Sequence, residues 1–204
     1  IAKIDLTHQF NRYNLLKIGT EVTSYDIKRL NYQQPWSGGF WAFDNMHRNP
    51  VEVAAYLQDK LEFSSFLVNV GVRMDYVDVR DKRWVDVTTP GGYKDEGTKQ
   101  WVVTNEIDTE PFLQVSPRLG IAFPITESTV FYSSYGHFFQ RADYTEMYTL
   151  RDPSVNAALV GNPGIEPQRT VAFEFGVKQQ LSENYSIDVG AYFKDITNLV
   201  GSTY

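Results

Sequence analysis

The chain has no cysteine, no long apolar run and no excess of basic residues, and each absence narrows what it can be. Without cysteine, a disulfide-stapled secreted scaffold and a cysteine-ligated zinc site are both excluded. No stretch approaches the roughly 18 apolar residues that a transmembrane helix requires. A net charge of −6 over 204 residues leaves no basic footprint for nucleic acid, so we expect no nucleic-acid partner.

Catalytic and metal-binding patterns are also missing from the sequence. The three histidines, His8, His47 and His137, are widely spaced and belong to no zinc-binding or catalytic motif. There is no nucleophile elbow and no phosphate-binding loop. The acidic stretch at 81–110 lacks the ligand spacing of a calcium loop. We therefore predict no catalytic residue, no metal site and no cofactor, and we expect that the chain is not an enzyme.

Aromatic residues and alternating patterns are abundant instead. The chain contains 13 Tyr, 13 Phe and 4 Trp, and aromatics make up 15% of it. From Phe66 to Tyr76 every second residue is apolar, while polar residues and Gly71 fill most of the positions between. Similar alternation occurs at 51–58, 113–123, 171–178 and 187–194. This period of two is typical of β-strands, and helical spacing is nearly absent.

The connections between the predicted strands alternate in length. With weaker runs at Ala2–Phe10, Leu15–Leu30 and Thr129–Phe139, the sequence predicts about eight strands. Short connections are expected at Asn11–Asn14, Phe63–Ser65, Pro124–Ser128 and Gln180–Asn184, and long ones at Asn31–Pro50, Asp81–Pro111 and Gln140–Arg169. Outer-membrane barrels place short turns in the periplasm and long loops outside. The pattern therefore favours an all-β, antiparallel, up-and-down transmembrane β-barrel segment, with its apolar faces turned to lipid.

Several segments also match the sequence patterns of one family. They are VAAYLQDKLE with NVGVRMDY (53–62 and 69–76), SPRLGIAFP (116–124), FYSSYGHFFQ (131–140), NPGIEPQRTVAFEFG (162–176) and AYFKDITNL (191–199). Together, and in this order, they resemble the C-terminal barrel of TonB-dependent outer-membrane receptors, especially the branch found in Bacteroidetes-like bacteria. Gln168-Arg169 stands where Glu-Lys is common in the family, which leaves the resemblance intact.

The resemblance implies a barrel of about 22 strands around a plug domain. Residues 1–204 are then expected to form a partial barrel domain, because they hold only about eight strands and no visible plug or TonB box. The N-terminus reads as the cut end of a longer or processed chain. The implied function is to bind a scarce large solute (a siderophore, vitamin, oligosaccharide or peptide) and import it with energy from TonB. The implied location is the bacterial outer membrane, and the implied partners are outer-membrane lipid, the plug domain, TonB and the solute.

Two other functions are compatible with an alternating β pattern. The chain could be a small complete outer-membrane barrel with a structural or adhesive role, in which case its first and last strands would pair. It could also be a soluble carbohydrate-binding β-domain, in which case its apolar faces would be paired inside a sandwich.

Candidate binding residues lie in the long connections and on the polar faces. In the 31–50 connection, aromatic rings flank Gly38-Gly39 and could stack on a solute, pack within the loop or dip into the membrane interface. We expect Trp36, Trp41, Arg141 and Tyr144 to lie on the extracellular side and to line the approach of the solute. The charged residues expected on the inner wall form either a solute path, plug contacts or interstrand ion pairs; they are Glu52, Lys60, Arg73, Asp75, Arg118, Glu174, Lys178 and Asp188.

Overall fold

Nearly all of the described chain is antiparallel β structure. The computed structural model describes residues 1–33, 42–86, 91–94, 101–148 and 161–201, and the one helix in these ranges is α1, Tyr144–Tyr148. None of the described helical residues forms a helix long and apolar enough to cross a membrane. Eight strands form the main sheet: β1 (Ala2–Gln9), β2 (Asn14–Ser24), β5 (Val51–Glu62), β6 (Leu67–Asp78), β11 (Phe112–Thr126), β12 (Thr129–Gln140), β13 (Gln168–Gln180) and β14 (Ser186–Thr197).

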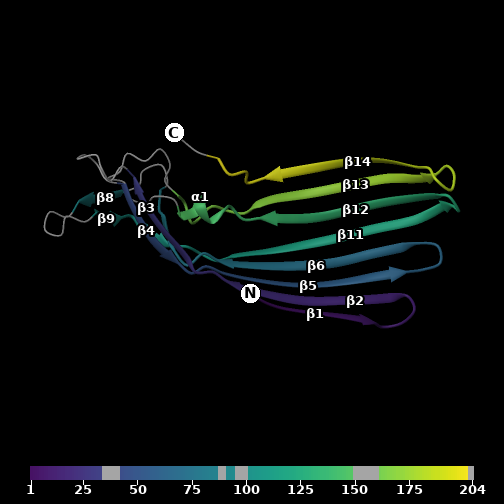
Figure 1. Cartoon of the computed structure of the whole chain (residues 1–204), viewed down its shortest axis with the longest axis horizontal. Coiled ribbons are helices and arrows are strands. Elements are labelled where there is room, and N and C mark those ends of the chain that lie inside the picture. The colour runs from purple at the N-terminus through teal and green to yellow at the C-terminus, as the bar shows by residue number, and fades with distance from the viewer. Residues whose placement is uncertain (34–41, 87–90, 95–100, 149–160, 202–204) are drawn as a thin grey trace.

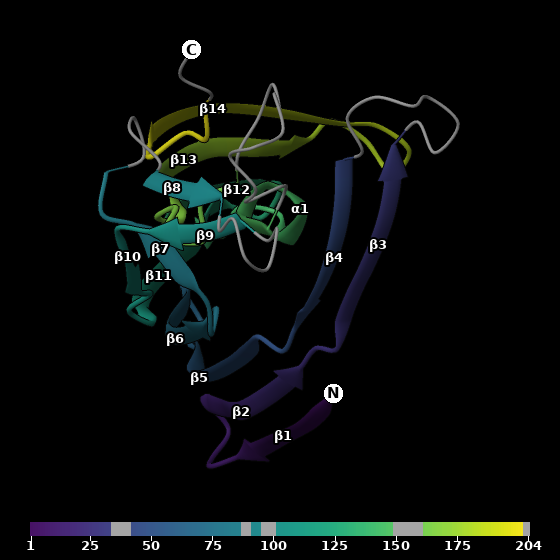
Figure 2. The same cartoon turned by 90° about the vertical axis from the view of Figure 1, so that its left-hand side faces the viewer.

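The order of the strands in the sheet is simple up-and-down. The sheet runs β1-β2-β5-β6-β11-β12-β13-β14, and every adjacent pair is antiparallel. End-on, the strands follow an open arc from β1 and β2 to β13 and β14 (Figure 2). In the described part of the chain β1 pairs only with β2 and β14 only with β13. The predicted fold class is confirmed, and the described sheet does not close on itself.

All four short turns lie at one end of the sheet and all three long connections at the other (Figure 1). At the first turn, the side-chain oxygen of Asn11 accepts hydrogen bonds from the backbone N–H groups of Tyr13 and Asn14 at 2.8 and 3.0 Å. The third turn is shorter than expected because β11 continues past Pro124 to Thr126, with an irregular register between these two residues. The separation of short and long connections expected from the sequence is confirmed.

The long connections contain small hairpins, which the sequence did not predict. β3 (Ile27–Gln33) pairs with β4 (Ala42–Arg48), β7 (Lys82–Trp84) with β10 (Glu106–Asp108), and β8 (Gly91–Lys94) with β9 (Trp101–Thr104). The predicted single strand from Leu15 to Leu30 is wrong, since β2 ends at Ser24. The N–H of Tyr25 still donates to the carbonyl of Pro50 at 3.1 Å, but Pro50 has no N–H to continue the ladder.

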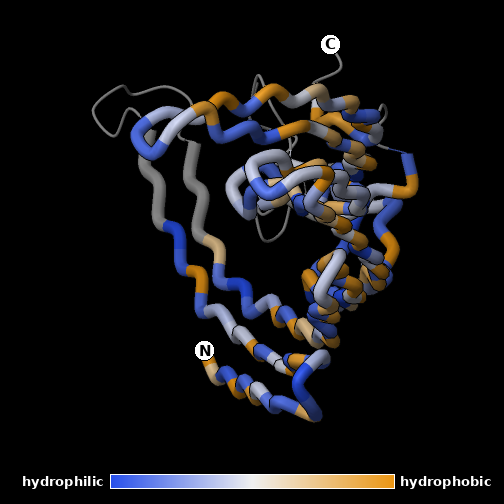
Figure 3. The backbone as a smooth tube through the Cα atoms, turned by 90° about the vertical axis from the view of Figure 1, so that its right-hand side faces the viewer, coloured by the Kyte–Doolittle hydropathy of each residue, from blue (hydrophilic) through white to orange (hydrophobic). Residues whose placement is uncertain are grey.

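One face of the sheet is apolar and stays open to its surroundings. Along the strands apolar and polar residues alternate (Figure 3), and the register places Val70 beside Leu119 on the outer face. Val70 is 44% exposed and Phe173 is 43% exposed. A soluble sandwich would cover such residues with a second sheet.

The apolar outer face climbs diagonally across the strands. One row joined by the pairing register runs His8, Leu16, Asp59, Val70, Leu119, Tyr135, Phe173, Phe193. On β14 the row passes through Phe193, which is the last apolar residue of the outer face before Asp195 at the long-loop end. On β1 the row passes through His8, which is the first polar residue of the outer face after Leu6 in the direction of the short turn. Strands tilted in a membrane barrel produce this offset, because the membrane cuts each strand at a different residue.

On the inner face, two tyrosines bridge strands across glycines. The Tyr56 hydroxyl on β5 donates to Asp5 on β1 at 2.7 Å, and a Cβ at Gly19 on the intervening β2 would overlap both side chains. At the other end of the sheet the Tyr132 hydroxyl donates to Asp188 at 2.9 Å, over Gly176. Glycine at each position allows a ring to lie flat against the wall and tie an outermost strand to the strand two places away.

Neighbouring residues on β6 test the two faces. Val70 lies on the outer face and Asn69, next to it, on the inner face. An Arg at a lipid-facing midplane position costs roughly 2–4 kcal/mol, whereas an Arg in a wet lumen stays solvated. We expect Val70→Arg to impair folding of the full-length protein into lipid vesicles strongly, and Asn69→Arg to have little effect.

Because a buried protein core would also reject Arg, a fluorescent probe on Val70→Cys supplies the control. This label is unique within the chain, which has no cysteine. The probe should be quenched by lipid-borne quenchers and shielded from aqueous ones. Protection from both would contradict a lipid-facing position.

Candidate functional site

At the long-loop end, the inner-face carboxylate of Glu52 draws three segments together. Arg141, just after β12, donates from Nε to Oε1 of Glu52 at 2.5 Å, and the Tyr144 hydroxyl donates to the same oxygen at 2.7 Å. The Tyr25 hydroxyl donates to Oε2 at 3.1 Å. The Arg141 guanidinium also lies 3.8 Å from the centre of the Tyr144 ring. Glu52 on β5 therefore holds the connection after β12, which crosses the inner side of β11 and β6 to reach it.

Local sequence explains why this connection forms a helical turn. Asp143 caps α1, because its carboxylate accepts the N–H of Thr145 at 2.7 Å. The Glu146 carboxylate in turn accepts the N–H of Asp143 at 3.0 Å. This reciprocal arrangement is a capping box. The hydrogen bond from the Thr145 N–H also lowers the pKa of Asp143.

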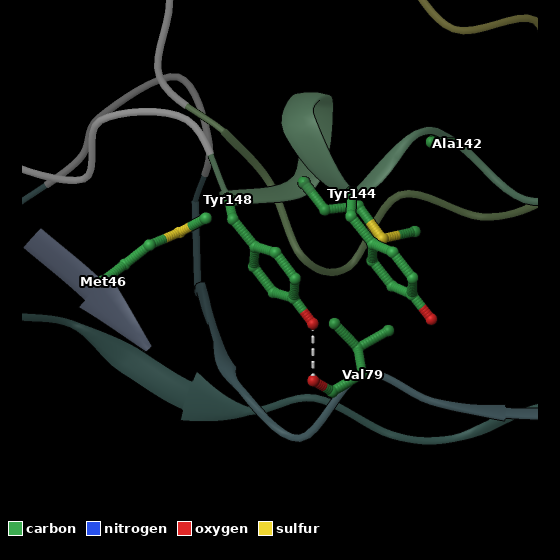
Figure 4. Close-up of a cluster of buried hydrophobic side chains, with 6 residues drawn as sticks. Met46, Val79, Ala142, Tyr144 and Tyr148 are labelled. Carbon is green, nitrogen blue, oxygen red and sulfur yellow. Dashed lines mark hydrogen bonds between the residues drawn. The ribbon is translucent and has the colours of Figure 1, made fainter. Parts of the chain in front are cut away.

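The apolar side of α1 packs into a small buried cluster. The rings of Tyr144 and Tyr148 stack with centres 5.6 Å apart, and the Tyr148 hydroxyl donates to the backbone carbonyl of Val79 at 2.7 Å (Figure 4). Val79 and Met147 are completely buried. The full cluster is Met46, Val79, Ala142, Tyr144, Met147 and Tyr148. It joins the β3–β4 hairpin, the end of β6 and α1.

The environment keeps both tyrosines of this cluster protonated. Burial, followed by the hydrogen bond to Glu52, raises the pKa of Tyr144 far above its ordinary value. Burial, together with the nearby carboxylate of Asp81, raises the pKa of Tyr148. Both hydroxyls therefore remain hydrogen-bond donors at any physiological pH.

Along the strands, on the short-turn side of this cluster, the inner face forms a polar trough of about 1070 Å³. Its lining includes side chains from β1 to β14. The eight charged residues predicted for the inner wall all occupy inner-face register positions. Three ion pairs of the main sheet join positions two apart on one strand: Lys3–Asp5, Lys60–Glu62 and Arg73–Asp75, the last at 2.7 Å. Arg118 lies over the Phe138 ring, with 4.8 Å between the guanidinium carbon and the ring centre. Such partly exposed pairs contribute less than about 1 kcal/mol each.

A second polar pocket, of about 640 Å³, lies at the long-loop end. It combines cations such as Arg48 and Lys82 with anions such as Asp81 and Asp108. Arg48 pairs with Asp81 at 2.9 Å. The described residues include no group of three or more His, Cys, Asp or Glu side chains placed to hold a metal ion.

The structure brings together two of the four predicted binding residues. Arg141 and Tyr144 lie side by side at the long-loop end, and both are engaged with Glu52. Trp36 and Trp41 lie outside the described residues. The alternating pattern of β5 places Glu52 on the inner wall but does not reveal its role as an anchor, because its partners Arg141 and Tyr144 follow it by 89 and 92 positions.

Comparison with known families decides the identity of the chain. The model of the family described as TonB dependent receptor-like, β-barrel, matches residues 2–204. The chain belongs to this family. TonB-dependent receptors are outer-membrane proteins, and the ordered motifs identified in the sequence agree with the match. Membership of the Bacteroidetes-like branch stays a prediction. A search of the curated proteins found no match.

Solved receptors share the fold of this receptor chain. The copper transporter OprC gives a TM-score of 0.68 at 15% identity, over 95% of this chain and 29% of OprC. The ferric-catecholate import receptor Fiu from E. coli K12 gives 0.61 at 16%, over 95% and 30%. The Serratia marcescens hemophore receptor HasR, solved with HasA and heme, gives 0.59 at 16%, over 95% and 32%. The chain thus spans about a third or less of each protein, and the likeness shows the fold alone.

Removing the Glu52 carboxylate should loosen the connection after β12. Hydrogen bonds to a charged group are worth roughly 1.5–3 kcal/mol, so Glu52→Ala should speed amide hydrogen exchange in Ala142–Tyr148 roughly tenfold or more in the full-length receptor. Glu62→Ala is the matched control, because Glu62 pairs with Lys60 at the short-turn end. Equal exchange in both variants would show that Glu52 does not hold α1.

Alkaline titration should separate the two clustered tyrosines from exposed ones. Because their folded-state pKa values are raised above the ordinary value of about 10, their contribution to stability is complete below that pH and is lost only as pH rises through the higher folded values. Tyrosinate absorbance of the receptor should therefore lose its latest-titrating component in a Tyr144→Phe, Tyr148→Phe double variant. Loss of a component near pH 10, where exposed tyrosines ordinarily titrate, would contradict the burial of these hydroxyls.

Proposed function

We propose that this chain forms part of the wall of an active-transport receptor in the bacterial outer membrane, which binds a scarce large solute and imports it with energy from TonB. The family match over residues 2–204 is the observation that carries the proposal. The apolar outer face, the polar inner trough and the separation of short turns from long connections support it. Outer-membrane lipid, a plug domain and TonB would be the partners of the full-length protein.

The class of solute is proposed broadly, as a siderophore, vitamin, oligosaccharide or peptide. The similar structures are a copper transporter, a hemophore receptor bound to heme and a ferric-catecholate import receptor, and at this identity they support the fold alone. The lining of the inner trough carries Lys3, Lys17, Arg73, Arg118 and Lys194 but only one carboxylate, that of Glu174, and such a polar wall suits a hydrophilic solute. A small complete barrel is disfavoured because β1 and β14 are not paired with each other. A soluble carbohydrate-binding domain is disfavoured by the exposed apolar face.

Trp36, Trp41, Arg141 and Tyr144 are proposed to line the approach of the solute on the extracellular side. Arg141 and Tyr144 would act as part of the rim that Glu52 holds in place, since their polar groups already bond to it. Trp36 and Trp41 would supply aromatic surface from the connection between β3 and β4. In this proposal Arg141 and Tyr144 form a rim that is fixed by Glu52, and Trp36 and Trp41 contact the solute directly.

Energy coupling can be tested in cells that express the full-length receptor. They should accumulate one member of a labelled panel of ferric siderophores, cobalamin, oligosaccharides and peptides, and accumulation should cease when TonB is deleted or the proton-motive force is collapsed. Accumulation that persists without TonB would identify a passive pore.

The aromatic residues can be tested by direct binding of the solute so identified. Aromatic contacts are worth roughly 0.5–1.5 kcal/mol each, so Trp36→Ala with Trp41→Ala should raise Kd roughly tenfold while barrel assembly stays intact. Tyr185→Ala is the control, because this exposed tyrosine lies in a turn at the opposite end. An unchanged Kd in a correctly assembled double variant would reduce the two rings to loop packing.

A further inference from the structure

Asp59 is a carboxylate on the apolar outer face. Its register partners are Leu16 on β2 and Val70 on β6, and Leu57 and Leu61 share its face along β5. Its Oδ1 atom is buried and has no hydrogen-bond partner among the described residues, although the residue as a whole is partly exposed. A buried carboxylate oxygen without a donor is destabilising. Oδ1 of Asp59 can therefore accept a hydrogen bond from a donor outside the described chain, and a cationic donor would also neutralise its charge.

The position of Asp59 in the climbing apolar band indicates where that donor would lie. Its row reaches the long-loop edge of the band on β14 and passes beyond the short-turn edge at His8 on β1. Asp59 on β5 lies two strands from His8 in this row. Leu61, paired with Val68, continues the apolar face between Asp59 and the short turn, so Asp59 lies inside the band, in the half nearer the short turns. Since short turns face the periplasm, this half of the band lies in the periplasmic leaflet.

An apolar groove begins directly beside Asp59 and runs towards the middle of the band. The groove has a volume of about 510 Å³ and occupies the next two rows across β1, β2, β5 and β6. Small residues at its centre, Thr20 and Ala55, make it hollow, and the Thr20 hydroxyl is satisfied by the carbonyl of Ala54 at 3.1 Å. Its apolar lining is Ile4, Leu6, Ile18, Leu57, Val72 and Met74.

We propose that Asp59 and this groove bind one phospholipid of the periplasmic leaflet, with a primary ammonium headgroup on Asp59 and an acyl chain in the groove. An ammonium with N–H donors can satisfy Oδ1, whereas a quaternary ammonium carries the charge without a donor. The groove is apolar, and the hydroxyl of Thr20 within it already has a hydrogen-bond partner. Such a surface matches a hydrocarbon chain. The site goes beyond solute import and rests only on the outer-membrane location.

Competitive lipid retention tests the site. The full-length receptor would be reconstituted in vesicles with equal phosphatidylethanolamine, phosphatidylcholine and phosphatidylglycerol, and the lipids that stay bound after mild detergent extraction would be measured by mass spectrometry. Wild type should retain phosphatidylethanolamine over phosphatidylcholine roughly tenfold, the effect of one charge-assisted hydrogen bond. Asp59→Asn should bring the ratio near one, and Asp59→Glu should keep most of the preference.

Two further variants separate charge from shape. Asp195→Asn is the matched control, because Asp195 is an outer-face carboxylate at the opposite boundary, and its lipid preference should equal that of wild type. Ala55→Phe should fill the groove and lower retention of the bound phospholipid without changing any charge. Assembly of each variant would be checked by its heat-modifiable migration on gels, and solute uptake should be unchanged.

Three results would overturn the proposal. One is equal retention of the three lipids by wild type. Asp59 would then be paired with a cationic side chain of a protein partner and not with a lipid headgroup. Another is an assembled Asp59→Asn receptor that keeps the full preference. The third is an assembled Ala55→Phe receptor with undiminished retention, which decides the question by itself if Asp59→Asn does not assemble. Each concerns lipid bound to the receptor, so failure here is distinct from failure of TonB-dependent uptake.

Discussion

Lipid offers no hydrogen-bond partner to a backbone N–H or carbonyl, and this constraint underlies the whole arrangement of the chain. Antiparallel pairing satisfies the backbone between strands, which leaves the side chains to deal with two different surroundings. The outer side chains are apolar yet open, as Val70 at 44% exposure illustrates, because the membrane takes the place of a second sheet. The sheet therefore needs no buried core of its own, and the buried cluster of the described residues lies beyond it, at the long-loop end.

That cluster shows how the watery end of the molecule is stabilised by ordinary means. Outside the membrane, the connection after β12 must be held by side chains, and Glu52 receives hydrogen bonds from Arg141, Tyr144 and Tyr25. Tyr148 and Met147 then exclude water beneath the turn. The connection after β12 reaches across to β5 at the long-loop end, so the residues that stabilise the rim lie on the side from which the proposed solute would enter.

Strand tilt links the register to the position of the membrane. Because the apolar band climbs across the sheet, residues in one register row meet different surroundings: Phe193 lies on its long-loop side and His8 on its short-turn side. Asp59 looks misplaced when it is compared only with Val70, its row neighbour. Considered together with the tilt, it lies in the half of the band nearer the short turns, where the proposed site lets its carboxylate meet an ammonium headgroup.

The sequence alone determined the strands, their faces and the separation of short from long connections, since a period of two and turn-forming residues are local properties. It placed Glu52, Arg73 and Arg118 on the inner wall for the same reason. It could not foresee the hairpins within the long connections, or that Glu52 would bind residues 89 and 92 positions away. The groove beside Asp59 likewise exists only because the register aligns Thr20 with Ala55. Contacts across strands depend on register and loop path, which only the tertiary structure decides.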